Sequence, residues 1–451
     1  MQVMSDPVAP APVPSADEAA ALAADAVELC SRLIRFDTSN FGGGESRGER
    51  ACAEWVAEQL TDAGLKPVVL ESAPGRASTV VRIPGEDPTA PALLVHGHLD
   101  VVPAEPSDWA SYPFSGEVRD GAVWGRGALD MKDMDAMMLA FVRHLARTGQ
   151  RPPRDLVFAF VADEEDTGEY GARFLVEQHP DLFEGVNAAI SESGGHSVHL
   201  PGGGRLYPIA AGERGSAWMT VTARGTAGHG SRGNDDNALV KLAAAIGRFD
   251  AHEWPVRLVP VVEALLDGLS RHLGVDIDPT DLSALGAAAD LVSGTLANSV
   301  NPTMLRAGYK HNVIPSEASA ALDGRLLPGT ATEFFATVDA LLGPDLTRTG
   351  DFQAPVSADH TTADFAAMAA ALRAHDPEAL VLPYCMTGGT DAKAFATLGI
   401  PGFGFVPGRT PADFDAWQYV HGVDEHVLTD SLGFGASVLT TYLMTHPRAF
   451  A

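Results

Sequence analysis

The chain of 451 residues has few cysteines, no long apolar segment and no early basic residue. Its three cysteines are too few, and odd in number, for a disulfide framework, which favours a reducing compartment. The longest useful apolar run, residues 156–162, is far shorter than the ~20 residues that a membrane span needs. The first basic residue is Arg32, so the N-terminal segment lacks the charged start of a signal peptide. We therefore expect a cytoplasmic protein.

Basic residues are also scarce relative to acidic ones. The sequence has 31 Lys and Arg against 59 Asp and Glu, which gives a formal net charge of −28. A field of this sign repels the phosphates of nucleic acids and the surface of anionic membranes, whereas it attracts divalent cations. We therefore expect no nucleic-acid or membrane partner, and a small-molecule substrate instead.

The order of predicted elements indicates one domain interrupted by another. Residues 1–16 are rich in Pro and Ala and are expected to be a disordered lead-in. Helices and strands alternate over residues 17–211, as in α/β folds, and the same alternation occurs again over residues 357–451. Residues 212–356 form an α+β unit of their own, in which residues 252–293 look like an insertion.

Side chains that bind metals follow three of the predicted strands, at the point where each strand ends. They are His98 and Asp100 after strand 92–95, Glu164 and Glu165 after strand 156–162, and Glu192 after strand 186–190. Asp130 begins a predicted helix whose methionines are expected in the core. In open α/β sheets the ligand crevice lies outside the carboxyl ends of the strands, so these side chains should meet at one edge of the sheet.

The charge that would gather at this edge points to metal ions. Four carboxylates would meet there: Asp130, Glu164, Glu165 and Glu192. Burying each costs several kcal/mol unless its charge is paired, and the nearby Arg126 and Lys132 are too few to balance them. Two divalent metals would balance the charge, and histidine with carboxylate oxygens suits zinc, or cobalt or manganese as substitutes. The alternative is a solvated acidic rim, which is common in so acidic a chain.

Five motifs in a fixed order carry a resemblance to a known family. They are His98-Leu-Asp100-Val-Val-Pro, Trp124-Gly-Arg-Gly-Ala-Leu-Asp130-Met-Lys132, Asp163-Glu-Glu165, Ser191-Glu-Ser-Gly-Gly195 and Gly388-Gly-Thr-Asp391. From about Val27 to the C-terminus the chain resembles the zinc metallopeptidase/deacylase family of acetylornithine deacetylase, succinyl-diaminopimelate desuccinylase, aminoacylase and glutamate carboxypeptidase. The resemblance implies a catalytic domain with a mixed sheet flanked by helices, interrupted by a smaller α+β lid domain through which two chains form a homodimer.

The resemblance also implies a ligand set for two zinc ions. His98 and Glu192 would hold one ion, Glu165 and His421 the other, and Asp130 would bridge them. His421 lies in residues 419–425, which are similar to the family's late metal-ligand segment, although His426 is a local alternative.

Further roles follow from the same resemblance. Asp100 would accept a hydrogen bond from His98 and fix the tautomer of its ring. The family's cis peptide would fall between Asp130 and Met131. Glu164 would act as the general base for a metal-bridging hydroxide that cleaves an amide bond. The substrate would be a small N-acyl amino acid or a dipeptide with a free α-carboxylate.

The substrate side of the site is implied in the same way. His229 resembles the family's lid histidine, which reaches the partner subunit's site and polarises the scissile carbonyl. Asn312 and Arg325 match positions that grip the polar end of the substrate, and Arg325 could pair with a carboxylate in bidentate fashion. Gly388 and Gly389 would let backbone N–H groups approach the same group.

Two departures from the family pattern leave alternatives open. Asp133 and Met134 stand where small residues are common, and the insertion at residues 252–293 would lengthen the lid and remodel the dimer surface or replace the partner's contribution. A dinuclear phosphoesterase and a non-catalytic metal-binding homologue are the alternative functions. The lack of a basic pocket speaks against the first, and the presence of both Glu164 and His229 speaks against the second.

Overall fold

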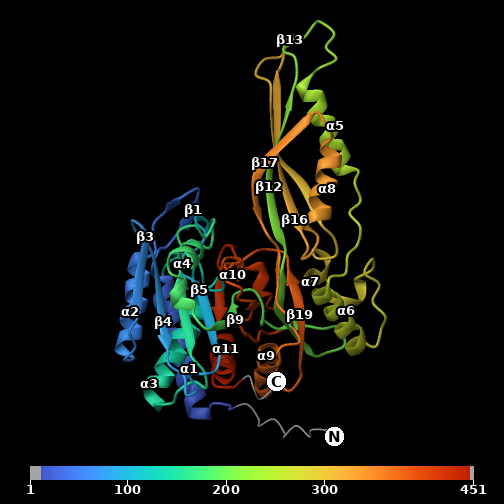
Figure 1. Ribbon diagram of the computed structural model, residues 1–451. Coiled ribbons are helices and arrows are strands. Elements are labelled where there is room, and N and C mark those ends of the chain that lie inside the picture. Colours follow the sequence, from blue (N-terminus) through green and yellow to red (C-terminus); the bar gives the residue numbers. More distant parts are fainter. Residues whose placement is uncertain (1–11, 447–451) are drawn as a thin grey trace.

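The computed structural model describes residues 12–446, and the chain forms a broad body from which a narrower unit projects (Figure 1). Residues 1–11 of the expected lead-in lie outside the described residues, and residues 12–15 precede the first helix, α1 (Ala16–Ile34). Ser15 caps this helix, and its side chain and that of Glu18 exchange hydrogen bonds with each other's backbone N–H groups. None of the helices within residues 12–446 combines the length and apolar character that a bilayer crossing requires.

The body is built on a ten-stranded mixed sheet. Its order is β10-β11-β20-β9-β5-β8-β4-β3, and β18 and β19 also pair with β11. The strands are β3 (Val68–Ala73), β4 (Arg76–Ile83), β5 (Ala92–His98), β8 (Leu156–Val161), β9 (Val186–Ser191), β10 (Val198–His199), β11 (Arg205–Glu213), β18 (Val356–Ser357), β19 (Ala379–Met386) and β20 (Gly402–Gly404). Strand β5 is parallel to β8 and β9, whereas β4 is antiparallel to β8, so the sheet is mixed as expected.

Helices cover both faces of this sheet, which explains the unbroken apolar run of β8. Phe158 and Phe160 face one core cluster with α3, while Val157 and Val161 face a second cluster with α4 and α10. Because successive side chains of a strand point to opposite faces, a central strand buried on both sides is apolar throughout. The flanking helices are α1, α2 (Arg50–Asp62), α3 (Lys132–Thr148), α4 (Ala172–Gln178), α9 (Ala363–His375), α10 (Ala392–Ala396) and α11 (Thr429–Leu443).

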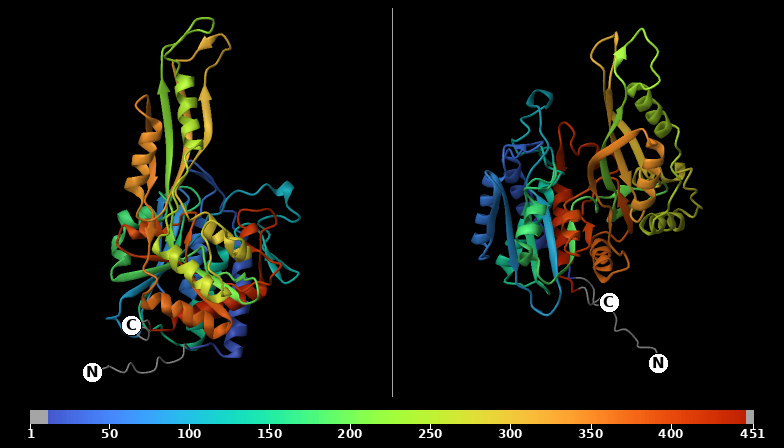
Figure 2. Two further views of the ribbon diagram at one scale, coloured as in Figure 1. Left: turned by 90° about the vertical axis from the view of Figure 1, so that its right-hand side faces the viewer. Right: turned by 45° about the horizontal axis from the view of Figure 1, so that its top comes forward.

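The projecting unit is a four-stranded antiparallel sheet with its own core. Its order is β14 (Ser299–Ala307), β16 (Glu317–Leu326), β12 (Gly215–Arg224) and β17 (Leu346–Gln353). Helices α5 (Ala238–Asp250) and α8 (Ala331–Leu342) pack on it, around Phe334. At its far end β13 (Gly228–His229) pairs with β15 (Val313–Ile314), and Figure 2 shows how far this tip extends from the body.

The insertion does not lie where the sequence suggested. Helices α6 (Pro260–Leu273) and α7 (Asp290–Ser293) pack against β19 of the body, and Val262, Leu265 and Leu269 belong to the body's core. The expectation that residues 252–293 lengthen the lid is therefore wrong. Their apolar helix face is buried on the edge of the large sheet instead (Figure 1). The domain limits 17–211, 212–356 and 357–451 stay predictions.

Among the longer strands, β11 and β17 were not predicted, because their sequences carry strand-breaking signals. Strand β11 contains Pro208, which cannot donate to a ladder, and β17 is largely polar with Gly350 inside it. The shorter elements are β1 (Asn40–Gly42), β2 (Glu45–Ser46), β6 (Glu117–Arg119), β7 (Ala122–Trp124) and β21 (His426–Leu428), with 3-10 turns at Pro106–Asp108, Pro180–Phe183, Ser283–Ala289 and Ala416–Gln418.

Candidate metal centre

The carboxyl ends of β5, β8 and β9 bring the expected side chains together. The ligand atoms of His98, Glu164 and Glu192 lie within 4.8 Å of one another, and so do those of His98, Asp130 and Glu165. His98 is the last residue of β5 and is buried, whereas the carboxylates are partly exposed. The strand order thus assembles the cluster that the sequence predicted, while the role of each residue as a ligand stays a prediction.

Asp130 lies between two histidines. Its Oδ1 is 3.0 Å from His98 Nε2 and its Oδ2 is 3.0 Å from His421 Nε2. His421 Nε2 is also 3.2 Å from Glu165 Oε2, and Glu192 Oε2 is 4.0 Å from His98 Nε2. One carboxylate with an oxygen toward each histidine has the arrangement of a bridge between two ions. The peptide bond between Asp130 and Met131 is cis, as expected.

A short sheet holds the segment that follows His421 near Asp130, although the two residues are far apart in the sequence. Strand β21 pairs antiparallel with β7, so His426 lies opposite Trp124, and their rings stack with centroids 3.9 Å apart. His426 is thereby held away from Asp130, which His421 reaches. Of the two histidines that the sequence left open, the structure brings His421 into the cluster.

Asp100 supports the cluster through both its backbone and its side chain. His98 Nδ1 lies 2.9 Å from the backbone carbonyl oxygen of Asp100 but 3.7 Å from its carboxylate. Asp100 therefore accepts the expected hydrogen bond from His98 with its carbonyl oxygen, which fixes the tautomer of the ring. The carboxylate instead accepts from the backbone N–H groups of Glu164 at 3.1 Å and Glu165 at 3.2 Å, so it orients both glutamates.

The electrostatics of the cluster reflect carboxylates that are crowded together and largely shielded from water. Burial raises the pKa of Glu164 and of Glu192 well above the ordinary value, and neighbouring carboxylates raise them further. Hydrogen bonds to Asp130 and Glu165 raise the pKa of His421 to about 10. Burial opposes protonation of His98, yet Asp130 and Glu192 outweigh it and raise its pKa. Opposite charge is thus what these acids require.

The donor set fits divalent metal ions. Glu165 Oε1 is buried and has no hydrogen-bond partner among residues 12–446. Two imidazole nitrogens and several carboxylate oxygens are the ligands of zinc and related metals in hydrolytic sites. Bound cations would satisfy this oxygen and offset the repulsion among the carboxylates. The same residues would hold the ions: His98, Asp130, Glu165, Glu192 and His421.

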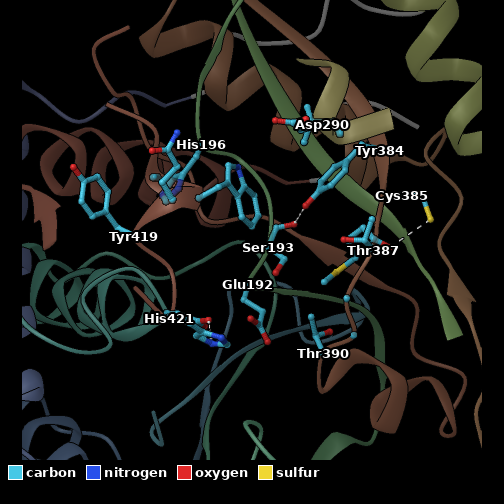
Figure 3. A pocket seen from close by; sticks show the side chains of 18 of the residues that line it. Glu192, Ser193, His196, Asp290, Tyr384, Cys385, Thr387, Thr390, Tyr419 and His421 are labelled. Carbon is cyan, nitrogen blue, oxygen red and sulfur yellow. Dashed lines mark hydrogen bonds and ion pairs between the residues drawn. The ribbon is translucent and has the colours of Figure 1, made fainter. Parts of the chain in front are cut away.

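A cavity of about 920 Å³ opens beside the cluster. Glu192 and His421 are among the side chains that line it (Figure 3). Arg325, Gly388 and Gly389 also line it, while their contact with a substrate stays a prediction. The Arg325 guanidinium is already paired with Asp323, with Nε to Oδ1 at 2.9 Å and Nη2 to Oδ2 at 3.2 Å.

His229 and Asn312 are not brought to the cavity within one chain. Both lie at the tip of the projecting unit, where Gly230 N donates to the backbone oxygen of Asn312 at 2.9 Å. His229 is exposed, and its Nδ1 is 2.8 Å from Ser231 Oγ. Both residues are therefore absent from the cavity lining in this structure, and their contact with a substrate stays a prediction.

Sequence reasoning missed two residues of the site. Glu425 holds the Asp130 loop, and Lys393 lines the cavity next to Gly389. The only signal for Glu425 was its place four residues after His421. The signal for Lys393 was its positive charge in a very acidic chain, two residues after the Gly388–Asp391 motif.

The chain belongs to peptidase family M20/M25/M40, whose model matches residues 94–445. It is 31% identical over 286 residues to aminoacylase-1 of Sus scrofa, and the match covers 63% of this chain and 62% of that protein. The M20 family metallo-carboxypeptidase Sso-CP2 of Sulfolobus solfataricus has a TM-score of 0.71 at 18% identity, covering 94% of this chain and 99% of the other. A dinuclear metal-binding M20 peptidase of Bacillus subtilis has a TM-score of 0.57 at 15% identity, covering 94% and 98%. The expected family and the mixed α/β fold are thus confirmed.

Proposed function

We propose that the protein is a metal-dependent amidohydrolase with two metal ions, which cleaves the amide bond of a small N-acyl amino acid or of a dipeptide with a free α-carboxylate. The observation that carries the proposal is the position of Asp130, with one oxygen 3.0 Å from each of two histidines beside a large cavity. Family membership and the names of the relatives, an aminoacylase and a carboxypeptidase, support the same reaction class.

Two zinc ions, or cobalt or manganese in their place, would supply a water of lowered pKa and a positive charge that polarises the substrate carbonyl. Glu164 is the proposed general base. Its backbone N–H is fixed by Asp100, and its carboxylate lies in the cavity beside His98 and Glu192. From there it takes a proton from the attacking water and delivers it to the leaving nitrogen, so that the products are a carboxylate and an amine.

Substrate binding would use the opposite wall of the cavity. Arg325 lies on β16 at the base of the projecting unit, and Gly388 and Gly389 follow β19 of the body. A ligand held between them would therefore contact both sheets. This arrangement lets the substrate's carboxylate be held at one end while the amide reaches the metal cluster at the other.

A homodimer through the projecting unit is part of the proposal. Strand β14 is an edge strand that exposes Met304 and Leu305 by more than half, and such an edge favours pairing with another chain. Pairing there would allow His229 and Asn312 of one chain to reach the partner's cavity. The cytoplasmic location expected from the sequence stays a prediction.

The experiment is a panel of N-acetyl amino acids, dipeptides and a phosphate monoester, assayed with and without a chelator and after re-addition of Zn²⁺, Co²⁺ or Mn²⁺. Amide hydrolysis that is lost with the chelator and restored by metal supports the proposal. Cleavage of the phosphate ester alone would indicate the phosphoesterase, and tight metal binding with no turnover of any substrate would indicate a non-catalytic protein.

A further inference from the structure

Only two Lys or Arg side chains line the large cavity among residues 12–446, and they are Arg325 and Lys393. The other titratable side chains on its wall are histidines and numerous acids, including Asp290, Asp413 and Asp415. A substrate carboxylate would be repelled from most of this surface. Its binding therefore depends on one or both of these two cations.

Arg325 is the less available of the two. Asp323 engages it through Nε and Nη2, with distances of 2.9 and 3.2 Å, so one full edge of the guanidinium is occupied by a carboxylate of the chain itself. A substrate carboxylate would have to displace Asp323 or use the remaining N–H groups in a less favourable geometry. The charge of Arg325 is also largely balanced by this partner.

Lys393 has unused donors. Its side chain is only 12% exposed, and its Nζ forms an ion pair with Glu213 Oε2 at 3.7 Å, which is longer than an ordinary hydrogen bond. The two oxygens of Glu213 already accept hydrogen bonds from Thr390, from Oγ1 at 2.7 Å and from the backbone N at 3.0 Å. An ammonium group offers three donors, so Lys393 can bind a further anion from the cavity.

The position of the ammonium also matches the glycines that were expected to contact the substrate. A Cβ on Gly389 would lie 2.0 Å from Lys393 Nζ, which means that the ammonium rests against the backbone of this glycine. Lys393 therefore lies on the wall of the cavity, against the glycine loop.

We propose that Lys393, together with the backbone at Gly389, is the main binding site for the α-carboxylate of the substrate, and that Arg325 paired with Asp323 has the lesser part. This inference rests on the proposed function, because it concerns the same cavity and substrate. It predicts selectivity for substrates that carry a free carboxylate over otherwise identical neutral ones.

The test compares wild type with Lys393→Met on two substrates, an N-acetyl amino acid and its C-terminal carboxamide. Losing a charge-assisted contact should lower kcat/KM for the acid by about 10- to 100-fold, mainly through KM, and change that for the amide by less than about threefold. A purely structural role would lower both equally. Lys393→Arg, which keeps the positive charge, should restore much of the acid-to-amide preference, and Lys393→Gln replaces the methionine variant if the latter does not fold.

The matched control is Lys66→Met, which removes an exposed lysine far along the chain from the cavity residues and should leave both substrates unaffected. An unchanged acid-to-amide ratio in Lys393→Met, with wild type active, would overturn the assignment of Lys393 alone. A wild-type enzyme that cleaves neither substrate in the presence of metal would instead overturn the proposed function.

Discussion

Arg126 and Glu425 form a buried ion pair, with Nη1 to Oε2 at 2.7 Å, that joins the loop of Asp130 to the loop of His421. The same Glu425 carboxylate accepts backbone N–H groups from Gly127 at 3.0 Å and Leu129 at 2.7 Å. Arg126 Nη2 donates to the backbone oxygen of His421 at 3.2 Å. The loops of two proposed ligands are thus positioned by one buried pair whose own side chains are not among the proposed ligands.

Replacing Glu425 by Gln should therefore weaken metal binding. The amide cannot balance the charge of Arg126 or accept as strongly from the loop, so Asp130 and His421 would be held less firmly. We expect metal affinity to fall by about 10- to 100-fold, as for other residues that orient ligands. Titration with a competing chelator measures this, alongside metal content after dialysis.

The control is Glu333→Gln, which removes the acid of an exposed ion pair with Arg257 on the projecting unit. Such a pair contributes about 0–1 kcal/mol, and it is remote from the ligand loops. Equal metal affinity in wild type and Glu425→Gln would show that the buried pair does not position the ligands.

Glu164→Ala should strongly reduce turnover without releasing metal. If Glu164 is the general base, its loss lowers kcat by about 100-fold or more, while metal content stays near two ions per chain. Elemental analysis of the purified variant and steady-state kinetics give the two values. The structure makes this measurement decisive, because the Glu164 carboxylate also lies within 4.8 Å of the ligand atoms of His98 and Glu192.

Loss of one metal ion from Glu164→Ala would identify Glu164 as a ligand. Glu165 would then be the next candidate for the base, and Glu165→Ala should keep its metal. The two variants are therefore compared in parallel.

Mixed dimers should recover activity if His229 acts on the partner's site. His229→Ala and Glu164→Ala are each expected to have little activity. In a hybrid dimer, the cavity of the His229→Ala chain keeps its Glu164 and faces the intact His229 of the Glu164→Ala chain. Up to about half of the wild-type activity per hybrid is expected, since one of two sites is complete. The activity is measured after the two variants are mixed and re-equilibrated.

Leu305→Lys in both chains serves as the control for this experiment. A charge on the exposed edge strand β14 should prevent pairing and so remove the recovered activity. No recovery in mixtures that are shown to contain hybrids would mean that each chain is self-sufficient.

Stability in acid should depend on Asp376. Hydrogen bonds from Arg205, and to a smaller extent from Tyr207, lower its pKa to about 2 although burial opposes this. Because the pKa in the folded state lies below the unfolded value near 3.9, the unfolded chain binds the proton more readily. The stabilisation is therefore complete at neutral pH and is lost as the pH falls from about 4 to about 2.

Asp376→Asn should remove this contribution, about 1.5–3 kcal/mol for hydrogen bonds to a charged group. Urea unfolding of wild type and variant should show a constant difference from about pH 7 to pH 5, which narrows as the pH falls below about 4. A difference that is independent of pH would exclude an electrostatic origin.

Local patterns were sufficient for the parts of the fold with a clear periodicity. The apolar strand β8 and the helix α3 with Met134, Met137 and Met138 on its buried face were predicted at nearly their observed bounds. Strand β11 was not, because Pro208 argues against a central strand when only neighbours in sequence are considered. Its place is stabilised by parallel pairing with β19, more than 170 residues away.

The sequence by itself determined which chemical groups gather in this protein, since the types and order of its acids and histidines at strand ends define a cluster that favours bound cations. The tertiary structure decided which groups meet. Pairing of β7 with β21 selects His421 over His426, the packing of α6 on β19 places the insertion on the body, and the side chain of Lys393 reaches the cavity rather than the solvent. The physical reason is that these contacts join residues far apart in the chain, and their energies depend on burial and geometry that no local pattern encodes.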